Sequence, residues 1–388
     1  NTFTSKGDGK SAQATYDRLL QKHPKSSYIP NVLLRQGLLY YNSNNNNKAL
    51  EKYKTVVSKF PNSPEARQAV TNVKNVYIDL GKVDEYADWV KNVKFVNVSN
   101  AELDDATFQS AENKFLDNNT ERAIAGFSDY LQRFPNGLNT LKANFYLAQS
   151  LSKVGKNDVA APHYKYVTEQ PKNEYTEESL AKLAQFYLDN DNWKSGIATL
   201  HILEKEANYP QNIVFAQSNL MKGYYESEEY ANVIKYAEKV LENPKVDKKV
   251  SEDANIIIAR SSFKTNDYEM AREFFHEVGQ NATGKLKAEC LYYNAFFLND
   301  EKAYEDSNQA VQNLIANYSN YKYWGVKSYV IMAKNYYALK DAYQATYILE
   351  NIVKNFKQFP DVIEEAQNEL NTIKNKEAKT NESVTKQN

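Results

Sequence analysis

NKALEKYKTVVSKFPNS, residues 47–63, returns 74 residues later in the chain as ERAIAGFSDYLQRFPNG, residues 121–137. Each copy opens on a small residue, Ala49 or Ala123, and places apolar or aromatic residues four and seven positions later. Offsets of 0, 4 and 7 fall on one face of an α-helix. A proline follows twelve residues after the alanine, and proline ends a helix because it lacks the amide donor and clashes with the preceding turn. The stretch therefore predicts an amphipathic helix with a small contact residue.

The same pattern occurs ten times, each copy 36 to 38 residues after the last, and only one of its opening residues is large. These residues are Ala12, Ala49, Tyr86, Ala123, Ala160, Gly196, Val233, Ala271, Ser307 and Ala345. A second contact position, usually small, precedes nine of them by twelve residues: Gly37, Lys74, Ala111, Ala148, Ala184, Met221, Ala259, Ala295 and Ala333. Each unit is thus predicted to be two helices. We expect an all-α superhelix, a solenoid of about ten helix pairs in which each pair contacts its neighbours.

No Gly/Ser-rich or Pro-rich linker interrupts the pattern. We therefore expect a polar lead-in at residues 1–10, a single solenoid with a C-terminal capping helix at residues 11–376, and a disordered tail at residues 377–388, where the chain is almost entirely polar. The asparagines at 44–47 are interpreted as the polar turn inside the second unit.

Composition argues against several classes of function. The 48 basic and 49 acidic residues leave a net charge of −1, whereas nucleic-acid binders carry a basic excess, so no nucleic-acid partner is expected. No apolar run is long enough to span a membrane. The four histidines fall on four different predicted helices and Cys290 is the sole cysteine, so neither a metal site nor a cofactor is predicted. We expect a protein that is not an enzyme.

The helix pairs, with small residues at two fixed places, aromatic residues after them and a closing proline, resemble the tetratricopeptide repeat over roughly residues 10–360. The period of about 37 residues is longer than the 34 of that family. The resemblance implies a non-catalytic protein-protein interaction scaffold that presents a concave surface of first helices to a protein or peptide partner. The Lys and Asn of the carboxylate clamp that co-chaperone members carry do not occur together in any unit.

The groove positions of the family lie three before, one after and four after the small residue of each first helix. Transferred to this chain, they select an aromatic row as the binding groove: Tyr41, Phe108, Phe115, Phe145, Tyr225, Phe263, Tyr292, Phe296 and Tyr337. Exposed rings could anchor a bound peptide. The alternative is that the rings turn inward and pack against neighbouring helices.

The junctions KFPNSP at residues 59–64 and RFPNG at residues 133–137 resemble those of tetratricopeptide proteins of the Gram-negative envelope, the outer-membrane assembly lipoproteins (BamD-like) and the Tol–Pal partner proteins (YbgF-like). This resemblance implies a periplasmic or outer-membrane-associated protein, with a cytoplasmic location as the alternative. Two other functions stay open: a helical accessory region of a larger enzyme or transport complex, and a solenoid that binds peptidoglycan or another glycan. Glycan binding would require aromatic rings with amide and carboxylate groups in one pocket. Self-association is also left open.

Overall fold

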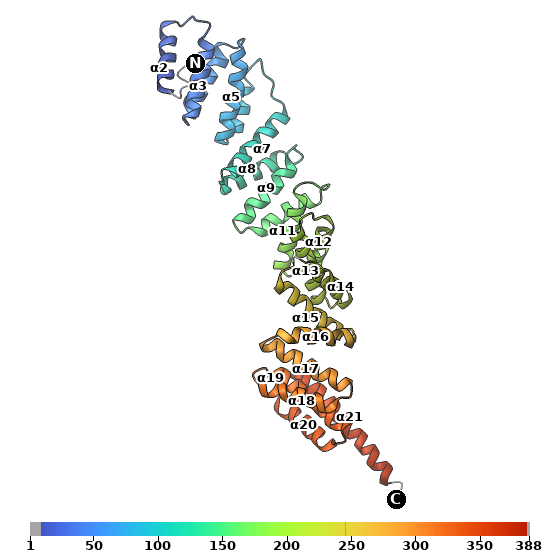
Figure 1. Ribbon diagram of the computed structural model, residues 1–388. Helices are drawn as coiled ribbons and strands as arrows, with labels where there is room; N and C mark the ends of the chain where they lie inside the picture. The colour runs from blue at the N-terminus through green and yellow to red at the C-terminus, as the bar shows by residue number, and fades with distance from the viewer. Residues whose placement is uncertain (1–8, 245, 386–388) are drawn as a thin grey trace. The chain divides into compact units, whose positions relative to one another are not determined.

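The structure is a computed structural model that describes residues 9–244 and 246–385. Its described residues form twenty helices and no strand (Figure 1). The chain divides into two compact units, Asn1–Asn192 and Trp193–Asn388. The expected single solenoid over residues 11–376 stays a prediction.

The first unit contains ten helices, in which a lone second helix is followed by alternating first and second helices. They are α2 (Gly9–Lys22), α3 (Ile29–Asn42), α4 (Asn46–Lys59), α5 (Pro64–Leu80), α6 (Val83–Val90), α7 (Asn100–Leu116), α8 (Thr120–Arg133), α9 (Thr140–Lys153), α10 (Asn157–Thr168) and α11 (Thr176–Asp189). The odd-numbered members are the first helices and the even-numbered members the second helices.

The second unit continues the alternation and ends on a longer helix. It contains α12 (Trp193–Glu206), α13 (Pro210–Glu226), α14 (Tyr230–Leu241), α15 (Lys248–Lys264), α16 (Tyr268–Asn281), α17 (Gly284–Asp300), α18 (Tyr304–Asn317), α19 (Lys322–Ala338), α20 (Ala342–Asn355) and α21 (Pro360–Thr385). The helical periodicity of the sequence is therefore confirmed throughout the described chain.

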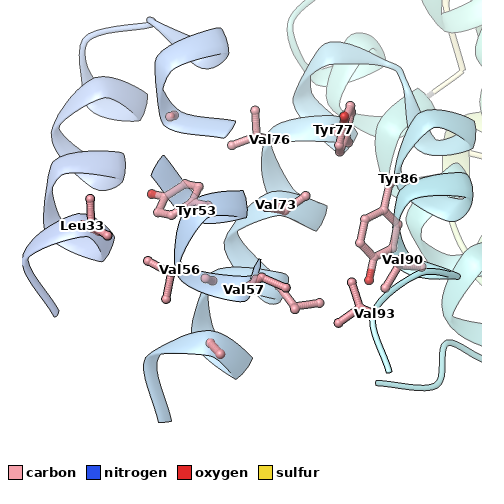
Figure 2. Close-up of a cluster of buried hydrophobic side chains, with 14 of the residues drawn as sticks. Leu33, Tyr53, Val56, Val57, Val73, Val76, Tyr77, Tyr86, Val90 and Val93 are labelled. Carbon is pink, nitrogen blue, oxygen red and sulfur yellow. The ribbon is translucent and has the colours of Figure 1, made fainter. Parts of the chain in front are cut away.

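The ten opening residues of the pattern all lie on second helices, and all ten are buried. Ser307 is the polar member, and its hydroxyl donates a hydrogen bond to the Ala295 carbonyl at 2.7 Å. The contact positions of the first helices are buried as well, except Lys74, which is partly exposed. Figure 2 shows Tyr53 and Val56 of α4 lying between Leu33 of α3 and Val73 of α5, in one buried cluster.

A residue in the left-handed backbone region recurs in each turn from a first to a second helix. These residues are Asn44, Gly81, Asn118, Gly155, Asp191, Glu228, Asn266, Lys302 and Lys340. Left-handed residues commonly follow the C-terminus of a helix, where their amides satisfy the last free carbonyls. The short turns therefore share a left-handed residue at the same place, although only two of the nine residues are glycines.

Three boundaries differ from those expected. Helix α2 begins at Gly9, inside the expected lead-in, and residues 1–8 lie outside the described chain. Helix α6 ends at Val90, so Val93, expected on the same helix, is buried from the turn that follows. Residues 377–385, expected to be disordered, continue α21, because their Glu, Lys and Ala residues favour helix and Glu377 accepts a hydrogen bond from the Tyr337 hydroxyl at 3.1 Å. Residues 386–388 of that expected tail lie outside the described chain.

Candidate functional site

The first helices form a layer of their own in each unit. In the first unit α3 contacts α5, α5 contacts α7, and α7 contacts α9. In the second unit α13 contacts α15, α17 contacts α19, and α19 contacts α21. Consecutive second helices within a unit make no comparable contacts among the described residues. The accessible side of this layer is here called the first-helix face.

The expected row of exposed aromatic rings is wrong for three of its nine members. Phe108, Phe145 and Tyr292 are at most 5% exposed. The ring of Phe108 packs edge-on against Tyr130, with ring centroids 5.6 Å apart. Phe108 and Phe145 pack against rings of the second helix of their own pair, Tyr130 and Tyr164, whereas Tyr292 packs against Trp324 of α19. The inward alternative therefore holds for them.

The other six predicted groove residues are partly exposed, and aromatic or charged neighbours cover much of each. Phe115 stacks on Tyr146 with centroids 4.4 Å apart. Phe263 packs edge-on against Phe296 at 4.9 Å. The other three are Tyr41 beside Asp79, Tyr225 against Tyr230, and Tyr337 beneath Lys376 and Glu377 of α21. The structure does not bring the nine residues together into one exposed groove.

Polar side chains occupy much of the first-helix face instead. Five pairs link one first helix to the next helix of the layer, and we call them the polar ladder. They are Glu112–Lys142 at 2.7 Å, Gln149–Glu178 at 2.8 Å, Lys222–Asp253 at 3.8 Å, Arg260–Glu289 at 2.7 Å and Lys334–Glu365 at 3.0 Å. The ladder and the exposed Thr71, Asn75 and Gln109 make this face hydrophilic.

Sequence reasoning missed the ladder although a regular signal was present. The first member of each pair directly follows the contact residue of its helix, and the partner lies 29 to 31 residues later. This spacing is one repeat less about two helical turns, because the partner lies nearer the N-terminal end of the next first helix. The family pattern assigns an aromatic residue or a clamp Asn to the position after the contact residue, and it does not predict a charge paired across the repeat.

The side chains of the polar ladder differ strongly in burial and in the hydrogen bonds that they make. Arg260 makes a two-pronged contact, with Nε and an Nη atom donating to the two carboxylate oxygens of Glu289 at 2.8 and 2.7 Å. The Glu289 side chain is 5% exposed, whereas Lys222 and Asp253 are 44% and 42% exposed. The hydrogen bond from Lys142 to Glu112 raises the pKa of the Lys142 ammonium. The ladder therefore joins successive first helices, most firmly at Arg260 and Glu289.

The pair His201 and Glu204, which share one helical face, belongs to a hydrogen-bond network in the second unit. His201 Nε2 lies 2.7 Å from the Tyr224 hydroxyl, and Nδ1 lies 3.2 Å from the Tyr236 hydroxyl. Glu204 accepts hydrogen bonds from Tyr236 at 3.1 Å and from Lys239 at 2.7 Å. Burial opposes ionisation of Glu204, yet the hydrogen bonds and charge of Lys239 lower its pKa overall. The network joins α12, α13 and α14 and occupies both ring nitrogens of His201.

No group of three or more His, Cys, Asp or Glu side chains suited to a metal ion occurs among the described residues. The thiol of Cys290 is buried, and this burial, together with the charge of Glu289, raises its pKa to about 12. Across the described part of the chain, no helix combines the length and apolar character that crossing a membrane requires.

Comparison with known proteins identifies the repeat in one segment. Residues 31–63, which lie in α3, α4 and the turns beside them, match the family model of the tetratricopeptide repeat. A search of curated protein sequences found no match.

Several solved structures are similar to the chain at low identity. A signal-transduction ATPase with a tetratricopeptide repeat sensor from Pyrococcus horikoshii is 15% identical, with 91% of this chain and 56% of that chain covered and a TM-score of 0.41. PilF of Pseudomonas aeruginosa is 16% identical, with 57% and 96% covered and a TM-score of 0.34. Yeast Tom70 is 12% identical, with 97% and 94% covered and a TM-score of 0.33. The tetratricopeptide repeat is thus matched at residues 31–63, and the helix pairs of both units give the chain an all-α fold.

Proposed function

We propose that this chain is a non-catalytic protein-interaction scaffold that binds a protein or peptide partner on the first-helix face. The observation that carries the proposal is the layer of first helices, which the polar ladder connects and second helices support from behind. A surface built this way is rigid before binding, so a partner loses little affinity to ordering of the scaffold. The match to the tetratricopeptide repeat, a family of interaction scaffolds, supports the same function.

The hydrophilic character of the face determines the kind of partner. A partner that recognises paired charges and amides is held by complementary polar groups, with partly exposed rings such as Phe115 contributing apolar contact. We expect such a complex to weaken with rising salt, because the charges at its rim are exposed to solvent. This expectation replaces the groove of exposed aromatic rings that the sequence suggested.

The test is partner capture by the intact chain and by two matched double variants. Asn75→Arg with Gln109→Arg places two long cations on the first-helix face, and both positions are exposed. Asn62→Arg with Gln132→Arg adds the same charges at exposed positions off that face. Proteins retained from a lysate of the source cells are compared by mass spectrometry. A partner lost with the first variant and kept with the second supports the proposal, whereas equal retention by both places binding elsewhere.

We further propose that the protein works in the cell envelope, periplasmic or associated with the outer membrane. The support is the resemblance of the junctions at residues 59–64 and 133–137 to those of envelope tetratricopeptide proteins. Fractionation of source cells with an antibody against the chain tests this location. Recovery in the periplasmic or outer-membrane fraction supports it, and recovery with cytoplasmic markers alone contradicts it.

A further inference from the structure

A polar pocket of about 610 Å³ opens in the first unit, at the C-terminal ends of α3, α5 and α7. We call it the amide pocket, because four of its lining residues are asparagines. The residues that carry the argument are Tyr41, Asn42, Asn44, Asn46, Asp79 and Asn113. They combine one aromatic ring, four amides and a carboxylate.

The carboxylate of Asp79 is held in place from two sides. It accepts hydrogen bonds from the Tyr41 hydroxyl and from Asn113 Nδ2, the latter at 3.2 Å. Lys114 Nζ donates to the Asp79 backbone carbonyl at 2.6 Å. Burial, then the hydrogen bond and charge of Asp79, raise the pKa of Tyr41 to about 12, so the phenol keeps the proton it donates. A carboxylate can accept about four hydrogen bonds, which leaves capacity for a ligand.

The side-chain amides at the junction between α3 and α4 are available to a ligand. The side chains of Asn42, Asn44 and Asn46 make no hydrogen bond within the described chain, whereas Asn45 caps α4 by accepting from the Lys48 amide. Asn44 adopts a left-handed backbone with φ of 58° and so fixes the turn. Each free amide offers two N–H donors and one carbonyl acceptor. The asparagine run therefore does more than connect two helices.

The chemistry of the lining selects the class of ligand. Two carboxylates, Asp79 and Asp117, face one cation, Lys114, so an anion is disfavoured. Apart from the Tyr41 ring, Leu116 is the one large apolar side chain of the lining, so an apolar anchor finds little surface. A neutral ligand rich in hydroxyl groups fits, because every hydroxyl both donates and accepts. Carboxylates and amides can each engage two adjacent hydroxyls, and an aromatic ring suits the C–H face of a sugar.

We propose that the amide pocket binds a neutral saccharide, with Asp79 and Asn113 holding adjacent hydroxyl groups, Asn42, Asn44 and Asn46 holding others, and Tyr41 supplying the aromatic surface. This activity goes beyond protein scaffolding and does not depend on it.

Saturation-transfer NMR on the full chain tests the proposal with four neutral saccharides: maltotriose, cellotriose, mannotriose and triacetylchitotriose. A capped trialanine peptide serves as the competing probe. We expect saturation transfer to at least one saccharide, with titration giving its dissociation constant. Asp79→Ala should weaken the binding of that saccharide about tenfold or more, since hydrogen bonds to a charged group are lost. Asn44→Gly should weaken it by a smaller factor, and Asn62→Ala, an exposed asparagine outside the pocket, should leave it unchanged.

Circular dichroism melting separates lost binding from lost folding. If Asp79→Ala unfolds the first unit, Asn44→Gly still decides, because glycine accepts the positive φ at that position. The proposal is overturned if no saccharide of the four shows transfer, or if binding is equal in the parent, Asp79→Ala and Asn44→Gly. It is also overturned if trialanine binds the pocket and the saccharides do not, which would make the pocket a peptide subsite.

Discussion

Gly37 of α3 lies directly against the ring of Tyr53 of α4, and Gly37→Ala tests whether this contact determines the packing. A Cβ atom at residue 37 would lie 2.4 Å from Cε1 and 2.6 Å from Cδ1 of Tyr53. The ring cannot move away easily, because Tyr53 is 1% exposed and belongs to a packed cluster with Leu33, Val56 and Val73 (Figure 2). The new methyl group therefore forces either the ring or the backbone to shift.

Two effects of opposite sign compete in this variant. Alanine is favoured over glycine inside a helix by about 1 kcal/mol. Overpacking a full core typically costs about 1–3 kcal/mol, and contacts this far below van der Waals distance lie at the upper end. We expect net destabilisation of about 2 kcal/mol. For a unit of this size that corresponds to a fall in melting temperature of about 4–8 °C.

The matched control is Gly325→Ala in α19, where the new Cβ would meet Leu314 Cδ2 at an ordinary 3.8 Å. We expect no loss there, and a gain of up to about 1 kcal/mol from helix propensity. Circular dichroism melting and urea unfolding of both variants measure the difference. Tyr53→Leu, combined with Gly37→Ala, should show a coupling that recovers part of the loss. If the melting temperature of Gly37→Ala equals or exceeds that of the parent, the contact between Gly37 and Tyr53 does not determine how α3 packs on α4.

Lys340→Gly should stabilise the chain to urea by about 0.5–1 kcal/mol, because Lys340 holds a φ of 70° that a side chain disfavours, and Lys340→Ala should give no such gain. Burial lowers the pKa of His163, so the folded state binds fewer protons than the unfolded state and stability should fall as pH drops below the ordinary value of 6.5; His163→Gln should flatten this part of the melting profile. Arg260→Gln should lower the free energy of unfolding by about 1–3 kcal/mol, because it leaves the buried Glu289 carboxylate without its partner. Lys222→Gln, in an exposed pair of the polar ladder, should lower it by less than about 1 kcal/mol. Similar losses for those two variants would show that burial does not set the strength of the ladder.

Parts of the site could be read from the sequence and parts could not. Tyr41 was selected as a groove residue and does line the amide pocket. The same rule selects Phe108, which is buried, whereas the neighbouring side chain of Gln109 in α7 is exposed. A rule that counts positions from one small residue assigns a side chain to a face of its helix. It does not say which neighbouring helix covers that side chain.

The sequence by itself determined the succession of helix pairs and the buried face of the second helices, because spacings of four and seven residues are local properties of a helix. Tertiary structure decided which first-helix side chains stay accessible, how the polar ladder pairs, and where the amide pocket opens. Those features depend on residues that approach only after helices pack: Tyr41 lies 38 residues from Asp79, and Asn113 lies 34 residues beyond it. Contacts across that distance follow from the stagger between neighbouring repeats, which no single helix pattern contains.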